Sequence, residues 1–425
     1  MKVAIVTLQL HTNYGGVLQA FALQRIIENL GNEVEIIQLG EILPEPRGMN
    51  ALRRILTRSF RKYVLGQRGV EIFRERRING EFPIVGVEFV RFFREYMNIR
   101  YVSSFNEIGS DDYDAFVVGS DQVWRPKYNP NLLHSYLDFT WTDAGRHDGS
   151  APAEAADGMS GGWNVRRLAY AVSFGSDVWE YPKALTRRAR RLAARFDALS
   201  FRELSGVENA GKHLGVSSET VLDPAMLFDA DEYVSLIWRC GGRRKDFSRP
   251  FEMTEGEPFG GTDDEKPVVK EGERNEPERG AVVFEYILDR TADTEALVTR
   301  LEGQLAMPAR RFLAANPRGR GEISLRVQPS VESWISGICS ASYVITDSFH
   351  ACVFSILFHR PFAVVGNRGR GLSRIEWLLG QLGLESRFVG NEDSLPGQDM
   401  DWDDVDARLD RLRSESMDFL KKNLK

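Results

Sequence analysis

One histidine in the chain combines a reactive side chain with a position suited to chemistry. His350 stands between the apolar runs of "YVITD" and "ACVFSILF", a pattern that predicts a strand turning into a helix. An imidazole beside the amides of a helix N-terminus can act as a general acid or base, or donate a hydrogen bond to a phosphate. Asp347 or Ser348 would then orient the ring. The simpler alternative is that Asp347 or Ser348 caps the helix and His350 has no chemical role.

The first loop of the chain offers a second candidate site. In "LQLHTNYGGVLQA", Gly15 and Gly16 stand at the start of a predicted helix, so backbone N–H groups beside them can approach a polar or anionic ligand. Asn13 adds a side-chain amide. The spacing matches neither of the common phosphate-binding loops. The alternative is a tight turn in which Thr12 or Asn13 only caps the helix.

Hydrogen-bonding side chains also end the buried run "DAFVVGSD". Ser120, Asp121 and Gln122 are suited to fixing the hydroxyls of a sugar, and the face of Trp124 could cover its ring. The alternative is that Ser120 and Asp121 cap a helical turn and Trp124 belongs to the core.

Two further apolar runs end in polar residues. "AVSFGS" carries Ser173 near its tip, and "SFRE" carries Arg202. An arginine at a strand end suits the paired oxygens of a carboxylate or phosphate. The alternative for Arg202 is a surface ion pair with Glu203 or another neighbour.

These side chains need a fold that brings strand ends together. Strand-length apolar runs alternate with amphipathic helical stretches, which is typical of α/β proteins with parallel sheets. We expect an N-terminal α/β unit over residues 1–228, a C-terminal one over 281–400 and a final helix over 401–425. Two such units usually hold their ligand between them, at the carboxyl ends of the strands.

Two stretches interrupt this alternation. Residues 142–162 and 241–280 are rich in charge, Gly and Pro and have little aliphatic periodicity. Because such stretches bury too little apolar surface to fold alone, we expect disordered insertions. The second lies within a linker over residues 229–280.

The composition argues against several classes of function. The chain has 55 Lys and Arg against 61 Asp and Glu, and its formal charge of −6 gives no reason to expect nucleic acid as a partner. Its three cysteines lack C-x-x-C spacing, so we expect no metal site, and we place Cys339 and Cys352 in the core. No apolar run reaches bilayer length and the amino terminus does not read as a signal peptide, so we expect a cytoplasmic protein.

A basic stretch, "ALRRILTRSFRKYVLG", is a candidate for peripheral membrane contact over residues 52–65. Its apolar residues share one face of a predicted helix beside several arginines, a composition suited to an anionic membrane surface. Such a helix would bring the site to a lipid-linked saccharide. The alternative, which we favour from the sequence, is a solvated basic face on a helix packed over the sheet.

Six stretches together resemble the polysaccharide pyruvyl transferase family. They are "NYGGVLQAFAL", "DAFVVGSDQVW", "AYAVSFG", "SFRE", "VLDPAMLF" and "YVITDSFHACVFSILFHRPFAVV", and they occur in the order seen in that family. The resemblance covers most of the chain apart from the two insertions and the basic stretch near residue 60. It implies a GT-B-like fold, in which two Rossmann-like domains face each other across a cleft.

The resemblance also implies an activity. The family's characterised enzymes move the enolpyruvyl carbons of phosphoenolpyruvate onto two hydroxyls of a sugar, forming a pyruvate ketal in polysaccharide biosynthesis, and no cofactor is implied. The family histidine falls on His350, and the arginine of its "RE" motif falls on Arg202. That assignment gives His350 proton transfer and Arg202 the binding of the donor's phosphate and carboxylate.

One position departs from the family pattern. Better understood members resemble one another in carrying an arginine two residues before the histidine, where this chain has Ser348. Arg368, Arg370 or Arg374 in "NRGRGLSR" would have to replace that charge at the donor. Two alternatives stay open: a GT-B-type glycosyltransferase that uses a nucleotide sugar, and a non-catalytic saccharide-binding accessory protein.

Overall fold

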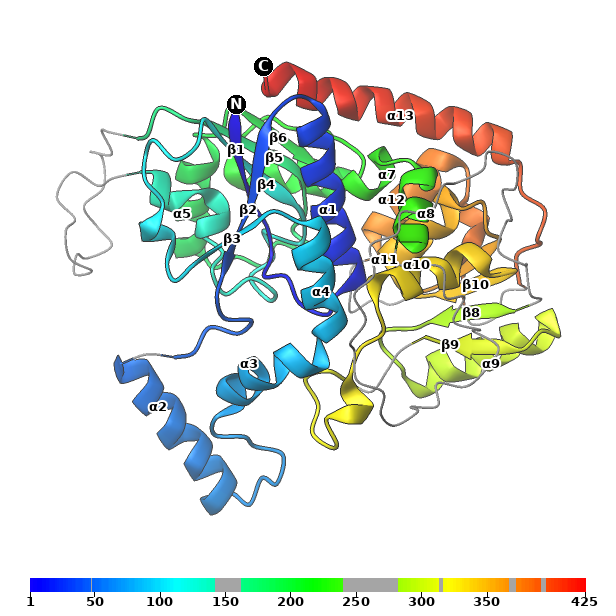
Figure 1. Ribbon diagram of the computed structural model, residues 1–425, viewed down its shortest axis with the longest axis horizontal. Helices are drawn as coiled ribbons and strands as arrows, with labels where there is room; N and C mark the ends of the chain where they lie inside the picture. Colours follow the sequence, from blue (N-terminus) through cyan, green and yellow to red (C-terminus); the bar gives the residue numbers. More distant parts are fainter. Residues whose placement is uncertain (47, 142–161, 240–281, 313–315, 367–371, 391–394) are drawn as a thin grey trace, which may run out of the picture.

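The computed structural model describes residues 1–46, 48–141, 162–239, 282–312, 316–366, 372–390 and 395–425 (Figure 1). Almost all of both expected insertions therefore lies outside the described residues. So do Arg368 and Arg370, two of the arginines predicted to bind the donor.

An N-terminal parallel sheet of seven strands has the order β3-β2-β1-β4-β5-β6-β7. Its strands are β1 (Lys2–Val6), β2 (Glu33–Leu39), β3 (Ile99–Val102), β4 (Ala115–Asp121), β5 (Arg166–Val172), β6 (Ala198–Phe201) and β7 (Glu219–Thr220). Its helices are α1 (Tyr14–Asn29), α2 (Gly48–Ser59), α3 (Arg74–Val85), α4 (Val87–Tyr96), α5 (Lys183–Ala193), α6 (Leu204–Asn209) and α7 (Pro224–Leu227). The next helix, α8 (Ala230–Arg239), packs on α10 (Val331–Ser340) of the second unit. π-Helical turns extend α2 as η1 (Phe60–Val64) and α6 as η5 (Ala210–Leu214).

A second parallel sheet has five strands in the order β12-β11-β10-β8-β9. These strands are β8 (Val283–Tyr286), β9 (Ala309–Arg311), β10 (Tyr343–Thr346), β11 (Phe362–Val365) and β12 (Phe388–Val389). The accompanying helices are α9 (Ala292–Leu305), α10 (Val331–Ser340), α11 (Phe349–Leu357), α12 (Ser373–Leu382) and α13 (Trp402–Asn423). The expected α/β fold with two Rossmann-like units of GT-B-like type is confirmed by these two parallel sheets.

Strand side chains explain why the central strands read as continuous apolar runs. Ile5 and Val117 are register partners across β1 and β4, and both belong to the core on one face of the sheet. Their chain neighbours Val6 and Val118 belong to a second core on the other face. Because helices cover both faces, residues 3–6 of β1 and 115–118 of β4 are apolar at every position, and the alternating pattern of a one-sided sheet is absent there.

The two units pack directly against each other. Tyr14, at the start of α1, stacks on Trp334 of α10 with ring centroids 5.6 Å apart, and its hydroxyl donates to the carbonyl of Pro329 at 2.8 Å. The largest apolar core accordingly includes residues of both sheets, with Ile5 from β1 and Val344 from β10.

The C-terminal helix ties the second unit back to the first. In Figure 1, α13 runs along the outside of both units. Ser416 accepts a hydrogen bond from the backbone of Leu222 at 2.9 Å, and Arg413 donates to the carbonyl of Met226 at 2.7 Å. The helix also packs on α12, and His359 stacks on Trp402 and pairs with Asp406 near its start, so α13 contacts both units.

The expected helix in the basic stretch forms as α2 and η1, but its predicted packing is wrong. Neither segment has a buried residue, and α2 projects from the body instead of lying over the sheet (Figure 1). Within the described residues, no helix combines the length and hydrophobicity needed to span a membrane. Cys339 and Cys352 are buried in the core, as expected.

Candidate functional site

Polar residues from both sheets meet where α1 and α11 face each other. Arg202 follows β6 and donates to Asp121 at the end of β4 and to Asp223 just after β7, each at 2.7 Å. His350, in the first turn of α11, approaches the same Asp223 from the second sheet. We call Asp121, Arg202, Asp223 and His350 the strand-end cluster.

Arg202 is the centre of this cluster. Its side chain is fully buried, so the alternative of a surface ion pair is wrong. Glu203 lies further away, at 3.9 Å from Nε, and the ring of Phe349 lies 4.8 Å from the guanidinium carbon. Two carboxylates already accept hydrogen bonds from Arg202, so Arg202 holds Asp121 and Asp223 in place. Binding of a donor anion by Arg202 stays a prediction.

The carboxylates of the cluster are held in their charged form. Burial alone would raise the pKa of Asp223, but attraction from His350, together with the charge and the hydrogen bond of Arg202, more than offsets it and lowers the pKa. Asp121 shows the same balance, with Arg202 as the main cause of its lowered pKa. Glu203 differs, because burial outweighs Arg202 and raises its pKa. The cluster is therefore a compact set of buried charges.

His350 lies between the carboxyl ends of the strands of the two sheets. Its Nε2 is 3.7 Å from Oδ2 of Asp223, which is an ion-pair distance but longer than a hydrogen bond. The ring packs on the backbone of Gly15 so closely that a Cβ added there would lie 2.0 Å from Nδ1. Gly15 is thus required for the approach of His350, a reason that the sequence did not reveal.

The residues preceding His350 do not orient its ring. Ser348 is the N-cap of α11, and its hydroxyl accepts from the amide of Ala351 at 3.4 Å. Asp347 instead accepts from the backbone of Leu288 and Asp289, at 2.7 and 3.1 Å. The capping alternative is therefore correct for Ser348, and the carboxylate that faces the His350 ring, at ion-pair distance, is Asp223.

Arg374 supplies a second cation from the C-terminal unit. It is buried at the start of α12, with its guanidinium carbon 5.7 Å from the ring of Phe349, on which Arg202 also lies. Burial and then the charge of Arg202 lower the pKa of Arg374 to about 10. Two guanidinium groups thus share one aromatic ring at the edge of the strand-end cluster.

The other polar residues at the ends of β4 and β5 support this arrangement. Ser120 donates to Asp223 at 3.1 Å and is fully buried. Gln122 accepts from Arg125 at 3.0 Å, and Ser173 accepts from the amide of Gly175 at 2.9 Å. Ser120 therefore bonds directly to the strand-end cluster, whereas Gln122 and Ser173 stabilise the neighbouring loops.

Trp124, which the sequence suggested as a cover for a sugar ring, lies in the core. Trp124 is completely buried, stacks on Tyr136 at 4.3 Å and donates to the carbonyl of Ser135 at 2.8 Å. It therefore belongs to the core, and its predicted role in covering a sugar ring is wrong. Asn13 holds the N-cap position of α1 and is exposed, and its side chain makes no capping hydrogen bond. A Cβ added at Gly16 would lie 2.9 Å from Nδ2 of Asn13, and the Gly16 carbonyl accepts a hydrogen bond from Gln19 at 2.9 Å.

Two residues of interest were missed or given little weight. Asp223 stands in "VLDPAMLF", where an acid before a proline reads as a helix cap, and its Oδ1 does cap α7. Its second oxygen takes part in the cluster.

His11 lines a hollow of about 10 Å³ with Arg318, and burial and Arg318 lower its pKa to about 3. His11 is therefore neutral near pH 7.

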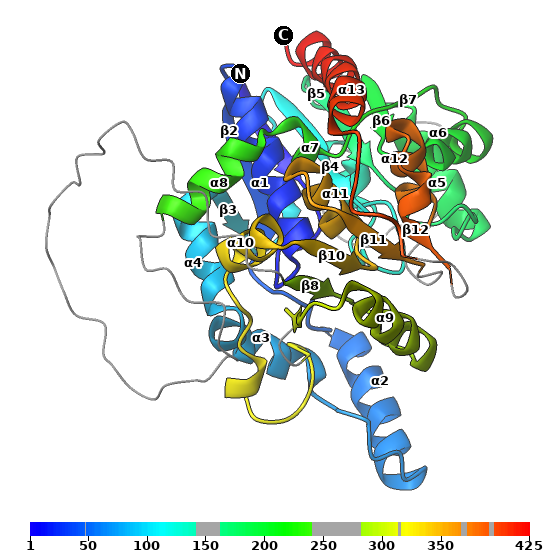
Figure 2. The ribbon, with the colours of Figure 1, turned by 90° about the vertical axis from the view of Figure 1, so that its right-hand side faces the viewer.

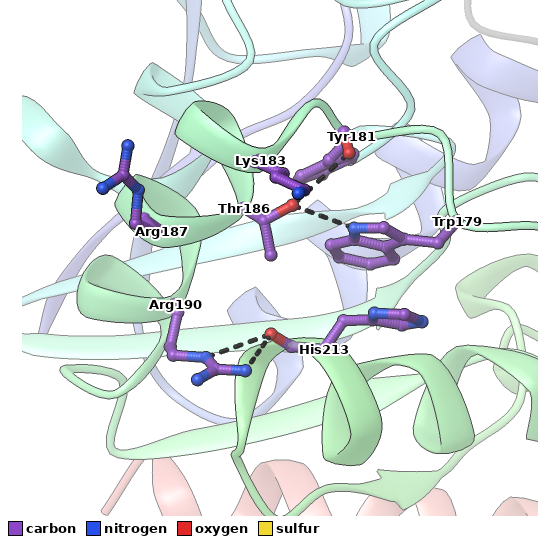
Figure 3. Close-up of a pocket in the computed structure, with 7 residues that line it drawn as sticks. All are labelled: Trp179, Tyr181, Lys183, Thr186, Arg187, Arg190 and His213. Carbon is purple, nitrogen blue, oxygen red and sulfur yellow. Dashed lines mark hydrogen bonds between the residues drawn. The ribbon is translucent and has the colours of Figure 1, made fainter.

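A larger cavity lies elsewhere, on the outer side of α5. It has a volume of about 580 Å³ and is lined by Trp179, Tyr181, Lys183, Thr186, Arg187, Arg190 and His213 (Figure 3). The Trp179 and His213 rings stack at 4.5 Å, and Arg190 donates to the carbonyl of His213. Its lining includes no residue of the strand-end cluster, so the two features are separate.

Comparison with known proteins gives a family match over most of the chain. A family model described as polysaccharide pyruvyl transferase matches residues 13–369. No curated protein matches. Within the described residues, no group of His, Cys, Asp and Glu is arranged to hold a metal ion.

Solved structures with a similar trace are distant in sequence. UGT89C1 of Arabidopsis thaliana complexed with UDP-L-rhamnose is 9% identical, with a TM-score of 0.45 over 99% of this chain and 98% of that one. UDP-GlcNAc 2-epimerase of Neisseria meningitidis bound to UDP-GlcNAc is also 9% identical, with a TM-score of 0.40 over 99% and 94%. Similarity at this level carries no argument about activity.

Proposed function

Because this chain belongs to the polysaccharide pyruvyl transferase family, we propose that it transfers pyruvate from phosphoenolpyruvate onto a saccharide as a ketal. The observation that carries the proposal is the approach of His350 to Asp223 between the two sheets. An imidazole held beside an ionised carboxylate, at the carboxyl ends of two parallel sheets, is placed for proton transfer to a ligand bound there.

The proposed reaction begins with proton transfer to carbon. His350 gives a proton to the methylene carbon of phosphoenolpyruvate, which becomes a methyl group and leaves an oxocarbenium-like centre. One sugar hydroxyl attacks that centre and loses its proton to the imidazole. A second hydroxyl then forms another C–O bond as the bond to phosphate breaks, and its proton leaves with the phosphate or solvent. Asp223 would stabilise the imidazolium and hold its orientation.

Recognition of the donor requires positive charge near His350. Arg374 is the described residue best placed to supply it, because its buried guanidinium lies at the edge of the strand-end cluster. The amides at the N-terminus of α11 add a partial positive charge. With Ser348 occupied as the N-cap, the proposed anion site depends on Arg374 and on the backbone, and Arg368 and Arg370 stay predictions.

A glycosyltransferase that uses a nucleotide sugar is the second candidate. The observation favouring it is that Ser348 caps α11 where characterised pyruvyl transferases resemble one another in having arginine. In that reaction the same cations would hold a diphosphate. A saccharide-binding accessory protein is the third candidate. Under each of them we propose a saccharide, free or lipid-linked, as partner, and cytoplasmic polysaccharide biosynthesis as the setting.

Mass spectrometry of the products separates these functions. The purified chain is incubated with phosphoenolpyruvate or nucleotide sugars and a panel of saccharide acceptors. A pyruvate ketal together with released phosphate supports the proposal. A gain of one hexose identifies a glycosyltransferase, and saccharide binding without any product identifies an accessory protein.

A variant pair tests the role of His350. His350→Gln should abolish ketal formation while leaving the unfolding transition close to that of the wild type. His213→Gln, on the outer side of the N-terminal unit, is the matched control and should keep full activity. Ketal formation by His350→Gln would remove this residue from the mechanism.

A further inference from the structure

The segment formed by α2 and η1 carries its apolar side chains on the outside of the protein. Met49, Leu56 and Tyr63 are 80%, 61% and 73% exposed, and Leu52 and Phe60 are also more than half exposed. An apolar group of this size is unusual on the surface of a soluble protein and commonly marks an interaction site.

The attachment of α2 explains this outward orientation. Arg58 donates two hydrogen bonds to Glu75 at the start of α3, at 2.6 and 2.7 Å, and a third to the carbonyl of Ile72. Arg54 reaches the same Glu75 at 3.5 Å. Residues four apart lie on one side of a helix, so the Arg54 and Arg58 side faces the protein.

The apolar face lies on the other side of the same helix. Leu52, Leu56 and Phe60 are also spaced by four residues, and they are offset from Arg54 and Arg58 by about half a turn at 100° per residue. This is the reverse of an ordinary amphipathic helix of a globular protein, which buries its apolar face. Figure 2 shows α2 extending from the body in a second view.

The charge around the apolar face favours one kind of partner. Residues 48–70 contain six basic side chains and no acidic one. By the same helical spacing Arg53 borders the apolar face, and Arg61 and Lys62 are exposed further round the helix. Their long side chains can keep their charges at lipid headgroups while the apolar residues enter the boundary below. A surface that is apolar at its centre, cationic at its edge and free of acidic groups complements an anionic bilayer.

We infer that α2 and η1 form a docking surface for an anionic lipid membrane, lying in the plane of its interface. The inference goes beyond the proposed reaction, because membrane binding requires neither donor nor acceptor. It gives the acceptor a location: a saccharide attached to a lipid would be presented beside the protein at the same interface.

Vesicle flotation of the full-length chain tests this inference. Wild-type protein should float with vesicles of phosphatidylcholine and phosphatidylglycerol and bind vesicles of phosphatidylcholine alone at least tenfold more weakly. Added salt should weaken binding to the anionic vesicles, because it screens the basic residues. No binding of the wild type to anionic vesicles would overturn the inference.

Two variants assign the binding to this segment. Leu56→Ser with Phe60→Ser should weaken binding at least tenfold by removing apolar contact. Arg53→Glu with Arg61→Glu and Lys62→Glu should reduce it further by reversing the charge at the edge. These substitutions spare Arg58 and Glu75, so the attachment of α2 is retained.

Control variants distinguish this surface from others. Arg187→Glu with Arg191→Glu reverses exposed charge on α5, and Val178→Ser removes an exposed apolar group elsewhere; both should bind vesicles as the wild type does. Equal binding by wild type and both α2 variants would overturn the inference. So would a wild-type dimer, measured by light scattering, that Leu56→Ser with Phe60→Ser converts to monomer without any vesicle binding, since a second copy would then be the occupant.

Discussion

The Nε2 of His350 lies 3.7 Å from Oδ2 of Asp223, although the two residues follow strands of different sheets. Asp223 also accepts from Arg202 and Ser120, so a single carboxylate connects the proposed acid–base group to the buried charges of the N-terminal unit. Docking of the two units is therefore needed to complete the site.

Replacing that carboxylate should affect activity and stability together. Asp223→Asn is expected to lower kcat/KM for ketal formation by roughly 10- to 100-fold, because the imidazolium loses its counter-charge. It should also lower the free energy of unfolding by about 3 kcal/mol, since buried Arg202 loses one of its two close partners. Product assays and urea unfolding measure the two effects.

Asp121→Asn is the matched control for this prediction. It removes the other close partner of Arg202, so it should cost a similar free energy of unfolding. Its effect on kcat/KM should be smaller, because Asp223 still faces His350. Equal losses of activity in the two variants would show that Asp223 acts only through stability.

A methyl group at Gly15 should displace His350. Gly15→Ala would place Cβ within 2.0 Å of Nδ1, so either the ring or α1 must move. We expect at least a 100-fold loss of kcat, since misplacement of a reacting group by about 1 Å costs that much. Gly211→Ala, where an added Cβ meets no atom within 4 Å, should leave kcat unchanged. Full activity in Gly15→Ala would contradict this account of the ring's position.

Loss of the Trp124 indole should destabilise the protein without altering its affinity for the saccharide. Trp124→Ala removes a fully buried side chain stacked on Tyr136 and should lower the free energy of unfolding by about 3–5 kcal/mol. The KM for the saccharide, measured well below the unfolding temperature, should stay within about twofold of the wild type. A large rise in KM with unchanged stability would restore Trp124 to the sugar site.

Acid should destabilise the protein through Asp121 and Asp223. The pKa of each carboxylate in the folded protein lies below the ordinary value of 3.8. At pH values between the folded pKa and 3.8, the unfolded chain therefore binds more protons than the folded protein. Their contribution to stability is complete above about pH 5 and is lost as the pH falls below about 4. Urea unfolding at several pH values should show a weaker dependence in Asp121→Asn; an unchanged slope would exclude this carboxylate as a cause.

Much of the fold was predictable because local pattern and architecture agree. The fully apolar run of β4 indicates a strand covered on both faces, and the helical spacing after Gly15 indicates α1. The strand ends then had to meet at one edge, which correctly brought Asp121 and Arg202 together. The same reasoning, applied to the second sheet, predicted that His350 would lie near these residues, and it lies 3.7 Å from Asp223.

The errors have physical causes. Trp124 follows polar residues at a strand end, and composition does not distinguish a ring that covers a sugar from one that fills the core. Asp223 caps α7 with one oxygen and serves the cluster with the other, so the local role concealed the distant one. For α2, periodicity defined an apolar face but not which side would meet the protein; that depended on Glu75, a partner outside the helix.

The path of α13 constrains how the site opens. This helix leaves the C-terminal unit and is fastened to the N-terminal one through Ser416 and Arg413, so the chain crosses between the units twice. Two units joined by a single crossing of the chain can rotate relative to each other in any direction. A second crossing restricts that rotation. We therefore expect any widening between Gly15 and His350 to be limited, with the contacts of α13 to Leu222 and Met226 retained.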